Sequence, residues 1–261
     1  MTNVPVYPVF TPLSLEHQGL FDRVFAQNPP EISECTFTNL YAWRNAYHFG
    51  IAELSGLLIV RSVFNDSVRF FEPLGNGDKR EVMERILIDT KSSFIRIPGA
   101  TKNFFEGDKR FAVALDRANA DYVYKTDDLI RLGGRKFDGK RNQIKKFFSA
   151  NTFEYVVLNA ASARECLSFA DAWCIVRDCD SVEGLRHERA ALEDMIVHFD
   201  AFGLIGGAIK VGNKICAVVL GQQLNPETLV MHILKADPNM PGLYQAMHHE
   251  FVKRQAQGFQ F

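Results

Sequence analysis

Basic side chains suited to binding phosphate are concentrated in residues 125–148. This stretch holds eight Lys or Arg residues and three Asp residues, a balance of plus five (8 − 3) in a chain of formal net charge −1. Glycines interrupt it before a predicted helix that carries Lys140, Arg141, Asn142 and Lys145. Mobile backbone N–H groups, a helix N-terminus and cationic side chains together favour phosphate binding. A solvated linker helix fits the same charges, because charge runs usually serve only solvation.

Histidines supply the other candidate chemistry. His232 alternates with Met231 and Ile233 in a predicted strand, so the pattern leaves open whether it faces the core or a cleft. Its usual pKa suits deprotonation of an amine or hydroxyl, although a lone strand histidine is more often structural. His248 and His249 are adjacent on a predicted helix and cannot form an i, i+4 metal pair, so we expect no metal site. No Ser-His-Asp order, Walker loop or zinc-protease helix is present, which argues against hydrolases, NTPases and metalloproteases.

The composition is that of a globular protein. With 261 residues, 47% hydrophobic and 23% charged, the chain is long enough for two domains of about 130 residues each. It has neither an apolar run of about 18 residues nor a signal-peptide pattern, so we expect no transmembrane span and a cytoplasmic protein. The near-neutral charge excludes a general basic coat for nucleic acid but permits a local patch. The five cysteines form no C-x-x-C pair, and we expect them to be reduced and mostly buried.

The apolar pattern predicts one order of elements twice, namely strand, helices, a three-stranded meander, helix and strand. In the first half we expect strands at 4–10, 48–54, 57–63, 68–72, 94–97 and 122–124 and helices at 15–25, 36–47, 79–91 and 101–106. In the second half we expect strands at 153–158, 204–211, 215–224, 228–235 and 258–261 and helices at 162–177, capped by Ser162, 188–199 and 241–255.

Two similar domains are the architecture that this order predicts. The Ala42-Trp43 pair on a helix of the first half has a counterpart in Ala172-Trp173 on a helix of the second, which favours an internal duplication. We therefore expect an α/β (α+β) fold with domains at residues 1–125 and 126–261. Each domain should contain a mixed, mostly antiparallel sheet flanked by helices.

Several short stretches resemble a bacterial family related to the C-terminal catalytic domain of phosphatidylglycerol lysyltransferases. They are FTNLYAWR at 37–44, DYVY at 121–124, 132–147 with its Lys140-Arg141-Asn142 core, KAD at 235–237 and GLYQ at 242–245. The order of elements also resembles the GNAT acyltransferase fold, so the resemblance implies two tandem GNAT-like domains. Such proteins continue past the last helix with a strand and a basic, tyrosine-containing tail. We therefore expect this chain to be a piece whose second domain lacks its last strand or strands.

The resemblance also implies site residues in the second domain. A GNAT-like cleft opens beside the fourth strand, and the next helix points its N-terminus at the donor's phosphates. The donor-binding or phosphate-binding residues implied are Lys235, Gly242, Tyr244 and Gln245, with Lys140, Arg141, Asn142 and Lys145 from the basic helix. The catalytic candidates are His232, Glu188 and Asp237, where Glu188 matches an acidic family position. Asp237 as a helix N-cap and Glu188 as a first-turn acid are equally consistent with the pattern.

The expected activity is transfer of an aminoacyl (or acyl) group to an amine or hydroxyl, such as that of a phospholipid headgroup, at the inner membrane face. The glycine-rich signature of coenzyme A binders is absent, and Asp237 would repel a pyrophosphate. Aminoacyl-tRNA is therefore favoured over acyl-CoA as cosubstrate, and no permanently bound cofactor is expected. The alternative is a non-catalytic module on the same scaffold that binds tRNA, a nucleotide or anionic lipid headgroups.

Overall fold

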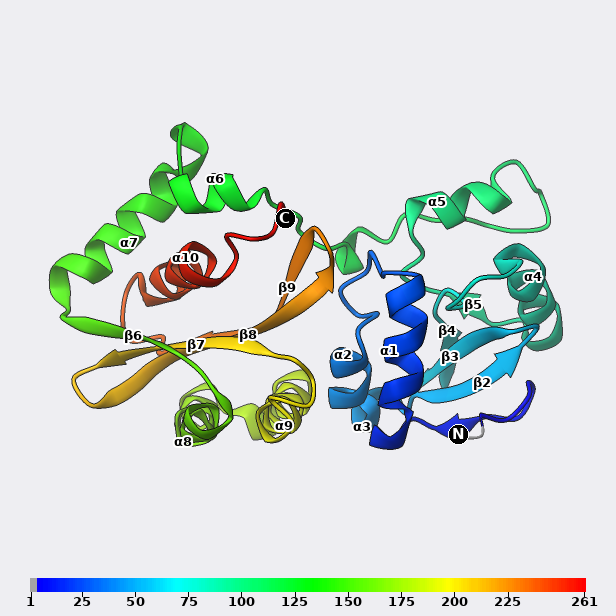
Figure 1. The fold of residues 1–261 in the computed structure, drawn as a ribbon, viewed down its shortest axis with the longest axis horizontal. Coiled ribbons are helices and arrows are strands. Elements are labelled where there is room, and N and C mark those ends of the chain that lie inside the picture. The colour runs from blue at the N-terminus through cyan, green and yellow to red at the C-terminus, as the bar shows by residue number, and fades with distance from the viewer. Residues whose placement is uncertain (1–3) are drawn as a thin grey trace. The chain divides into compact units, whose positions relative to one another are not determined.

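The computed structural model describes residues 4–261, and the chain packs as two compact units (Figure 1). Unit 1 ends at Tyr122, and unit 2 runs from Val123 to Phe261. Each unit contains one sheet with helices beside it, which confirms the expected α+β character. Among residues 4–261, no helix is both long enough and apolar enough to cross a membrane.

Unit 1 is built on a five-stranded sheet of order β1-β2-β3-β4-β5, in which only β4 and β5 are parallel. The two hairpins turn at Ser55-Gly56 and Asn65-Asp66, and all four residues have positive φ, as tight hairpin turns require. The strands are β1 Thr11–Pro12, β2 Gly50–Leu54, β3 Leu57–Phe64, β4 Ser67–Phe70 and β5 Ser93–Phe94. The helices are η1 Leu15–His17, α1 Gln18–Gln27, α2 Phe37–Ala42, α3 Arg44–Tyr47, α4 Lys79–Thr90, α5 Gly99–Lys102, η2 Asn103–Phe105 and η3 Arg117–Asn119.

Three predictions for unit 1 are wrong in detail. The strand predicted at 4–10 is reduced to a single bridge from Val6 to Glu53, in a stretch whose prolines lack the N–H that a ladder needs. The helix predicted at 36–47 divides at Trp43, where the backbone leaves helical geometry (φ −97°, ψ 5°). Residues 122–124 are not a strand, because no neighbouring strand pairs with them.

Unit 2 has an antiparallel sheet of order β6-β7-β8-β9 between two layers of helices. In Figure 1, α6, α7 and α10 cover one face of this sheet, and α8 and α9 cover the other. The strands are β6 Phe153–Val157, β7 Ile205–Val211, β8 Lys214–Asn225 and β9 Thr228–Ala236. The helices are α6 Thr126–Arg131, η4 Arg135–Phe137, α7 Asp138–Ala150, α8 Ala160–Arg177, η5 Cys179–Ser181, α9 Glu183–Val197 and α10 Leu243–Gln255.

A hydrophobic core fixes α7 and α10 against this sheet. Phe147 of α7 and Phe251 of α10 are fully buried together with Val219 of β8. Ile144 lies three residues before Phe147, so both side chains lie on the same face of α7 and the charged residues are left on the other. The basic helix is therefore an anchored element of unit 2.

The helices on the other face begin earlier than predicted. Helix α8 is capped by Asn159, whose Oδ1 accepts from the Ser162 backbone N–H at 3.0 Å, while Ser162 Oγ accepts from the Asn159 N–H at 2.9 Å. Ser162 thus completes a capping box and is not the N-cap. Helix α9 starts at Glu183, five residues before the predicted start. Residues 258–261 form no strand, although the Phe261 carbonyl accepts from Leu229 N–H at 2.9 Å.

Candidate functional site

A β-bulge in β9 decides which side chains of this strand face α8 and α9. Leu220 of β8 pairs with Ile233, but the next residue, Gly221, pairs with Met231, so His232 is an extra residue in the ladder. Such bulges re-aim the side chains that follow them and often lie beside functional sites. The sequence prediction relied on regular alternation of side chains through His232, and the bulge breaks that alternation.

The bulge places the Lys235 side chain on the face of the strand that is covered by α8 and α9. Val230 and Lys235 are five residues apart, so in a regular strand they would lie on opposite faces. In β9 both are buried, at 8% and 2% exposure, because the extra residue restores the same phase. Gly221 permits the bulge, since a Cβ at that position would lie 2.5 Å from the Val230 carbonyl oxygen. Lys235 therefore enters the layer between the sheet and α8–α9.

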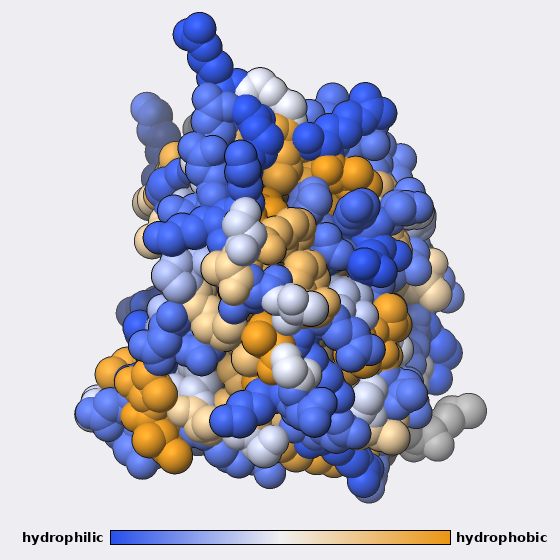
Figure 2. Space-filling model, turned by 90° about the vertical axis from the view of Figure 1, so that its left-hand side faces the viewer, coloured by the Kyte–Doolittle hydropathy of each residue, from blue (hydrophilic) through white to orange (hydrophobic). Residues whose placement is uncertain are grey.

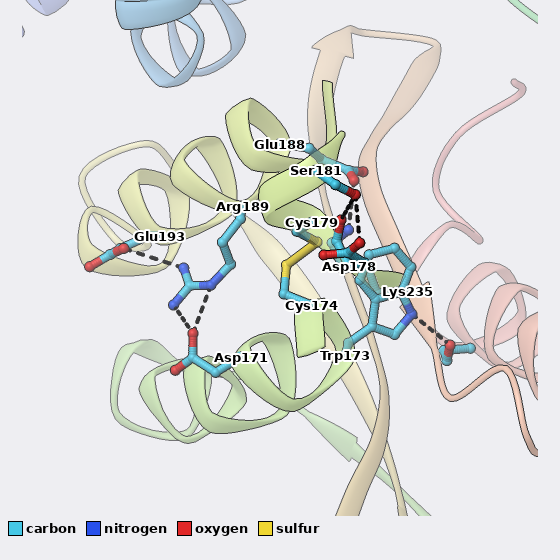
Figure 3. Close-up of a disulfide and its surroundings, with 11 residues drawn as sticks. Asp171, Trp173, Cys174, Asp178, Cys179, Ser181, Glu188, Arg189, Glu193 and Lys235 are labelled. Atoms are coloured by element: carbon cyan, nitrogen blue, oxygen red, sulfur yellow. Dashed lines mark hydrogen bonds and ion pairs between the residues drawn. A yellow bond between two sulfur atoms is a disulfide. The ribbon is translucent and has the colours of Figure 1, made fainter. Parts of the chain in front are cut away.

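Lys235 is held there by an aromatic ring and a carboxylate (Figure 3). Its Nζ lies 3.6 Å from the centroid of the Trp173 ring and 2.6 Å from Glu188 Oε2. The Trp173 indole N–H donates to the Ala236 carbonyl at 2.9 Å, which fixes the ring against the strand. A buried ammonium needs such compensation for its lost hydration. We call Trp173, Glu188 and Lys235 the Lys235 cluster.

Two further links hold α8 and α9 around this cluster. Arg189 of α9 bonds through Nε to Asp171 of α8 at 2.9 Å and also pairs with Glu193 at 3.3 Å. A disulfide joins Cys174, in the last turn of α8, to Cys179 of η5. The prediction that all cysteines are reduced is therefore wrong. Asp178 ends α8 in a left-handed conformation (φ 50°), which turns the chain back and brings the two Cα atoms to 5.0 Å.

The structure separates the three catalytic candidates. Glu188 joins Lys235 and lies in the second turn of α9, so its interpretation as a first-turn acid is wrong. His232 Nε2 lies 3.0 Å from Gln222 Oε1, and burial lowers the pKa of His232 from 6.5 to about 4. At neutral pH His232 is therefore an uncharged, weak base, which removes the argument from its usual pKa. Asp237 Oδ1 accepts from the Asn239 backbone N–H at 2.9 Å within the loop and does not cap α10.

The predicted anion site at the start of α10 is closely packed. Gly242 is the N-cap (φ 85°), and a Cβ at this position would overlap the Gln143 carbonyl oxygen of α7. This glycine therefore lets α10 approach the backbone of α7. Tyr244 is 53% exposed and Gln245 is half-buried, so the first turn of α10 is buried on one side only.

The charges of the basic stretch divide into paired and unpaired groups. Its three aspartates form ion pairs, Asp127 with Arg131 at 3.1 Å, Asp128 with Lys136 at 2.9 Å, and Asp138 with Arg141. Arg141 also donates to the carbonyls of Leu132 and Gly134, so it anchors the loop between α6 and η4. Five cations (8 − 3) have no acidic partner among residues 4–261, and these are Lys125, Arg135, Lys140, Lys145 and Lys146.

Two of the predicted phosphate ligands, Arg141 and Lys145, line a shallow groove of about 460 Å³ between α6, α7 and α10. Its walls include Arg131 and His249 together with the apolar Ile130, Leu132, Ile144 and Phe148. Figure 2 shows the end of unit 2 that carries α7, where hydrophilic residues cover most of the surface and hydrophobic residues appear between them. We call the groove lined by Arg131, Arg141 and Lys145 the basic groove.

Lys140 and Asn142 are exposed on α7 outside the groove, and Lys140 Nζ lies 5.8 Å from the Tyr124 ring centroid. The basic groove lies on the α10 face of the sheet, whereas the Lys235 cluster lies on the α8–α9 face. The predicted residues thus fall into two places. Trp173, which completes the cluster, had been noted only as half of a repeated Ala-Trp pair. Among residues 4–261, no group of three or more His, Cys, Asp or Glu side chains is placed to hold a metal ion.

Comparison with known proteins supplies the family. Residues 25–261 match the family described as phosphatidylglycerol lysyltransferase, C-terminal. A conserved protein of unknown function from Bacteroides thetaiotaomicron is 31% identical, with a TM-score of 0.84 over 96% of this chain and 88% of that chain. The C-terminal DUF2156 domain of a lysylphosphatidylglycerol synthetase from Agrobacterium fabrum is 9% identical, with a TM-score of 0.60 over 94% of this chain and 76% of that chain.

The second likeness concerns the fold alone, because its sequence identity is so low. No functionally curated protein matches the chain. The family match spans nearly the whole chain and agrees with the resemblance carried by its short motifs. The chain therefore belongs to the phosphatidylglycerol lysyltransferase C-terminal family.

Proposed function

We propose that this chain is an aminoacyltransferase that moves an aminoacyl group from an activated, phosphate-bearing donor to an amine or hydroxyl acceptor. The family description supports aminoacyl transfer to a lipid, and a phospholipid headgroup at a membrane surface is the acceptor we favour. Aminoacyl-tRNA is the favoured donor. The loop before α10 carries Asp237 where a coenzyme A site would need groups that tolerate pyrophosphate.

We further propose that the two units are tandem GNAT-like domains. In both, helices precede a three-stranded antiparallel meander, and a helix follows it. Trp43 lies between α2 and α3 of unit 1, and Trp173 lies on α8 of unit 2. These parallels support a duplication, in which unit 2 kept the polar groups suited to catalysis.

The Lys235 cluster is the observation that carries the proposal. When an amine or hydroxyl attacks the ester carbonyl of the donor, negative charge develops on the carbonyl oxygen, and a preorganised ammonium stabilises it. Lys235 has three N–H donors, of which one faces Glu188 and another faces the Trp173 ring. The remaining donor is the one we propose for that oxyanion, once donor binding has opened the cluster. Glu188 holds the ammonium in position through the 2.6 Å contact to its Oε2.

The reaction needs no covalent enzyme intermediate. The acceptor forms a bond to the carbonyl carbon and gives up a proton, and collapse of the tetrahedral intermediate breaks the ester bond, whose oxygen takes up that proton and leaves as a ribose hydroxyl. Lys235 is 2% exposed and Glu188 is 28% exposed, so the carboxylate forms the outer side of the cluster. Donor binding therefore has to open the cluster at Glu188. The low exposure keeps the ammonium poorly screened by water, which strengthens its interaction with the oxyanion.

The basic groove is our candidate for contacts to the donor's phosphates. Lys145 lines the groove without an acidic partner among residues 4–261, and Arg131 and Arg141 lie beside it. Phosphate contacts of this kind supply affinity that falls with salt and carry no sequence information. A large donor such as tRNA can contact both faces of a unit, whereas a small acyl ester cannot.

A transfer assay tests the proposal. The full chain is incubated with aminoacyl-tRNA labelled in the amino acid and with vesicles of an anionic phospholipid that has a free hydroxyl in its headgroup. We expect label in the lipid fraction and a loss of about 100-fold in Lys235→Met, as for removal of one oxyanion donor. Lys145→Ala should weaken tRNA binding and lower its salt dependence, and Lys146→Ala, outside the groove, is the matched control.

Lys140→Ala and Arg141→Ala test the remaining basic residues. Arg141 also anchors the carbonyls of Leu132 and Gly134, so its variant needs a circular-dichroism check that the fold survives. Tight tRNA binding without transfer to any amine or hydroxyl acceptor would contradict the enzyme. That result would favour the non-catalytic binding module, for which the unpaired cations of the basic stretch are the supporting observation.

A further inference from the structure

We infer that Cys174 and Cys179 form a reversible thiol–disulfide site that controls the packing around Lys235. The bridge spans five positions in sequence and closes the turn between α8 and η5. A loop this short restricts the unfolded chain less than a long one does. The effect of the bridge is therefore mainly local, on the elements that it joins.

Those elements carry both partners of Lys235. Trp173 directly precedes Cys174 on α8, and Glu188 lies on α9, which begins shortly after Cys179. Figure 3 shows the disulfide between these two helices, with Trp173, Lys235 and Glu188 on one side of it. The bridge therefore fixes the end of α8 relative to the start of the α9 segment, where the ring and the carboxylate meet the ammonium.

The other cysteines are unsuited to thiol exchange. Cys35, Cys166 and Cys216 are free and buried. Burial raises the pKa of Cys35 and of Cys166 to about 12, so neither forms the reactive thiolate at neutral pH. Cys174, in contrast, is half-buried, and its neighbour Ile175 is 82% exposed. We therefore expect reagents in solution to reach the bridge from the side of Cys174.

Exchange with a small dithiol balances without any other reactant. A thiolate of the dithiol attacks Cys174 Sγ, the bond between the two cysteine sulfurs breaks, and Cys179 leaves as a thiolate that takes up a proton. The second thiol of the reagent then attacks the mixed disulfide and releases Cys174 as a thiol. Two electrons and two protons have moved to the protein, and the reagent has become a disulfide. A small disulfide such as glutathione disulfide reverses the reaction.

Opening the bridge frees the turn that ends α8. Asp178 adopts a left-handed conformation there (φ 50°), which is less favourable for Asp than for Gly. The ion pair of Arg189 with Asp171 holds α8 two residues before Trp173 and does not involve Trp173 itself. We expect the last turn of α8 to relax on reduction and to weaken the Trp173 indole hydrogen bond to Ala236, so that the ring moves off Lys235 Nζ.

Tryptophan fluorescence tests this directly, because the chain has two tryptophans. In Trp43→Phe, all emission comes from Trp173. The full-length variant is reduced with dithiothreitol and reoxidised with glutathione disulfide, and free thiols are counted in each state after denaturation. We expect three thiols in the oxidised state and five in the reduced state (5 − 2 = 3), with a reversible shift of the Trp173 emission. This measurement does not depend on transferase activity.

Two further variants make the test decisive. Adding Cys174→Ser and Cys179→Ser should fix the emission near its reduced value, whereas Cys166→Ala, at a buried free cysteine, should leave the redox response intact. If the double serine variant fails to fold, Lys235→Met in the Trp43→Phe background serves instead, because removing the ammonium should reduce the redox response. The inference is overturned if the emission is the same in both redox states, or if the native chain always has five thiols or always three.

Discussion

The two units place different side chains where the third strand of the meander ends. In unit 1, Glu72 lies two residues beyond the end of β4, pairs with Lys79 of α4 at 3.1 Å and accepts from the Thr101 hydroxyl. In unit 2, Lys235 is the last residue but one of β9 and lies against Trp173 and Glu188. The acid of unit 1 is satisfied by residues that follow it in the chain. The lysine of unit 2 is satisfied by helices that precede it.

The repeated Ala-Trp pairs show the same difference. The Trp43 ring packs 5.9 Å from the ring of Tyr47, within an aromatic cluster that also contains Phe49. The Trp173 ring instead contacts the Lys235 ammonium, and its indole N–H donates a hydrogen bond to the Ala236 carbonyl. The tryptophan of the Ala-Trp pair thus packs against aromatic rings in unit 1 and contacts a charged side chain in unit 2. Charge buried beside a strand end is the feature that favours unit 2 as the reactive half.

The strand edges differ as well. In unit 1, β5 lies parallel to β4 and covers that edge. In the part of unit 2 that the structure describes, β9 is the last strand of its sheet, and Phe261 contacts it only near its start, at Leu229. The edge beside Lys235 therefore has no paired strand among residues 123–261.

The largest expected difference in stability between the units concerns the N-cap of the helix that follows each meander, α4 in unit 1 and α10 in unit 2. Gly242→Ala forces a Cβ into the left-handed region and against the Gln143 carbonyl, and we expect it to destabilise the protein by about 3 kcal/mol or more. Helix α4 is instead capped by Asp78, whose side chain accepts from Glu81 N–H at 2.9 Å. Asp78→Ala should cost only about 1 kcal/mol. Urea unfolding of both variants measures the difference, and equal costs would contradict the account.

Removal of the carboxylates should give an intermediate effect. Glu188→Gln leaves the Lys235 ammonium buried without its counter-charge, and we expect a loss of about 2–3 kcal/mol, less than for a fully buried pair because Glu188 is 28% exposed. Glu72→Gln in unit 1 should cost about 1 kcal/mol, because Lys79 is 25% exposed and remains hydrated.

The double variant Glu188→Gln/Lys235→Met completes a thermodynamic cycle. Met removes the buried charge, so most of the stability lost in Glu188→Gln should return, to within about 1 kcal/mol of the wild type. Additive losses in the double variant would mean that the two side chains do not interact as the structure indicates.

The smallest expected effect is a dependence on pH that originates in unit 2. Burial lowers the pKa of His232 from 6.5 to about 4, so below pH 6.5 the unfolded chain binds a proton that the folded chain does not. The contribution of His232 to the free energy of unfolding is therefore fully present above pH 6.5 and falls as the pH drops towards 4. For this one group we expect a loss of about 1 kcal/mol between pH 7.5 and pH 5.5.

His232→Gln should flatten this dependence by that amount, as measured by urea unfolding at several pH values. His248, whose pKa is also lowered to about 4 by burial, with repulsion from Lys140 adding to the effect, should contribute a second increment of the same sign. His248→Gln is the matched comparison. A slope unchanged in both variants would show that other groups dominate the acid response.

The sequence predicted the regular parts of both units well. The meander strands and the Ser55-Gly56 turn followed from alternation and turn residues, and α4, α8 and α10 followed from apolar spacing and caps. The pairing of Glu188 with Lys235 was not foreseen, although both residues had been selected. Their meeting depends on the bulge at His232, which is set by the close approach of Gly221 to Val230 across two strands. No local pattern in β9 indicates it.

The other errors have the same origin in non-local contacts. The Cys174–Cys179 bridge depends on one left-handed residue, Asp178, between them. The role of Gly242 is set by the backbone of α7, which precedes it by about 100 residues in the chain. Spacing identified the residue types that matter, and the contacts between elements decided what each of them does.

A single-turnover assay tests the central claim, that the Lys235 cluster is the reaction centre, most directly. Enzyme in excess is loaded with labelled aminoacyl-tRNA, acceptor vesicles are added, and the rate of transfer is compared for Lys235→Arg and Lys79→Arg. Both variants keep the charge, but only the first alters an ammonium held against a ring and a carboxylate. We expect the rate to fall by about 100-fold in Lys235→Arg and to stay near that of the wild type in Lys79→Arg. Equal rates in the two variants would contradict the assignment of the reaction to unit 2.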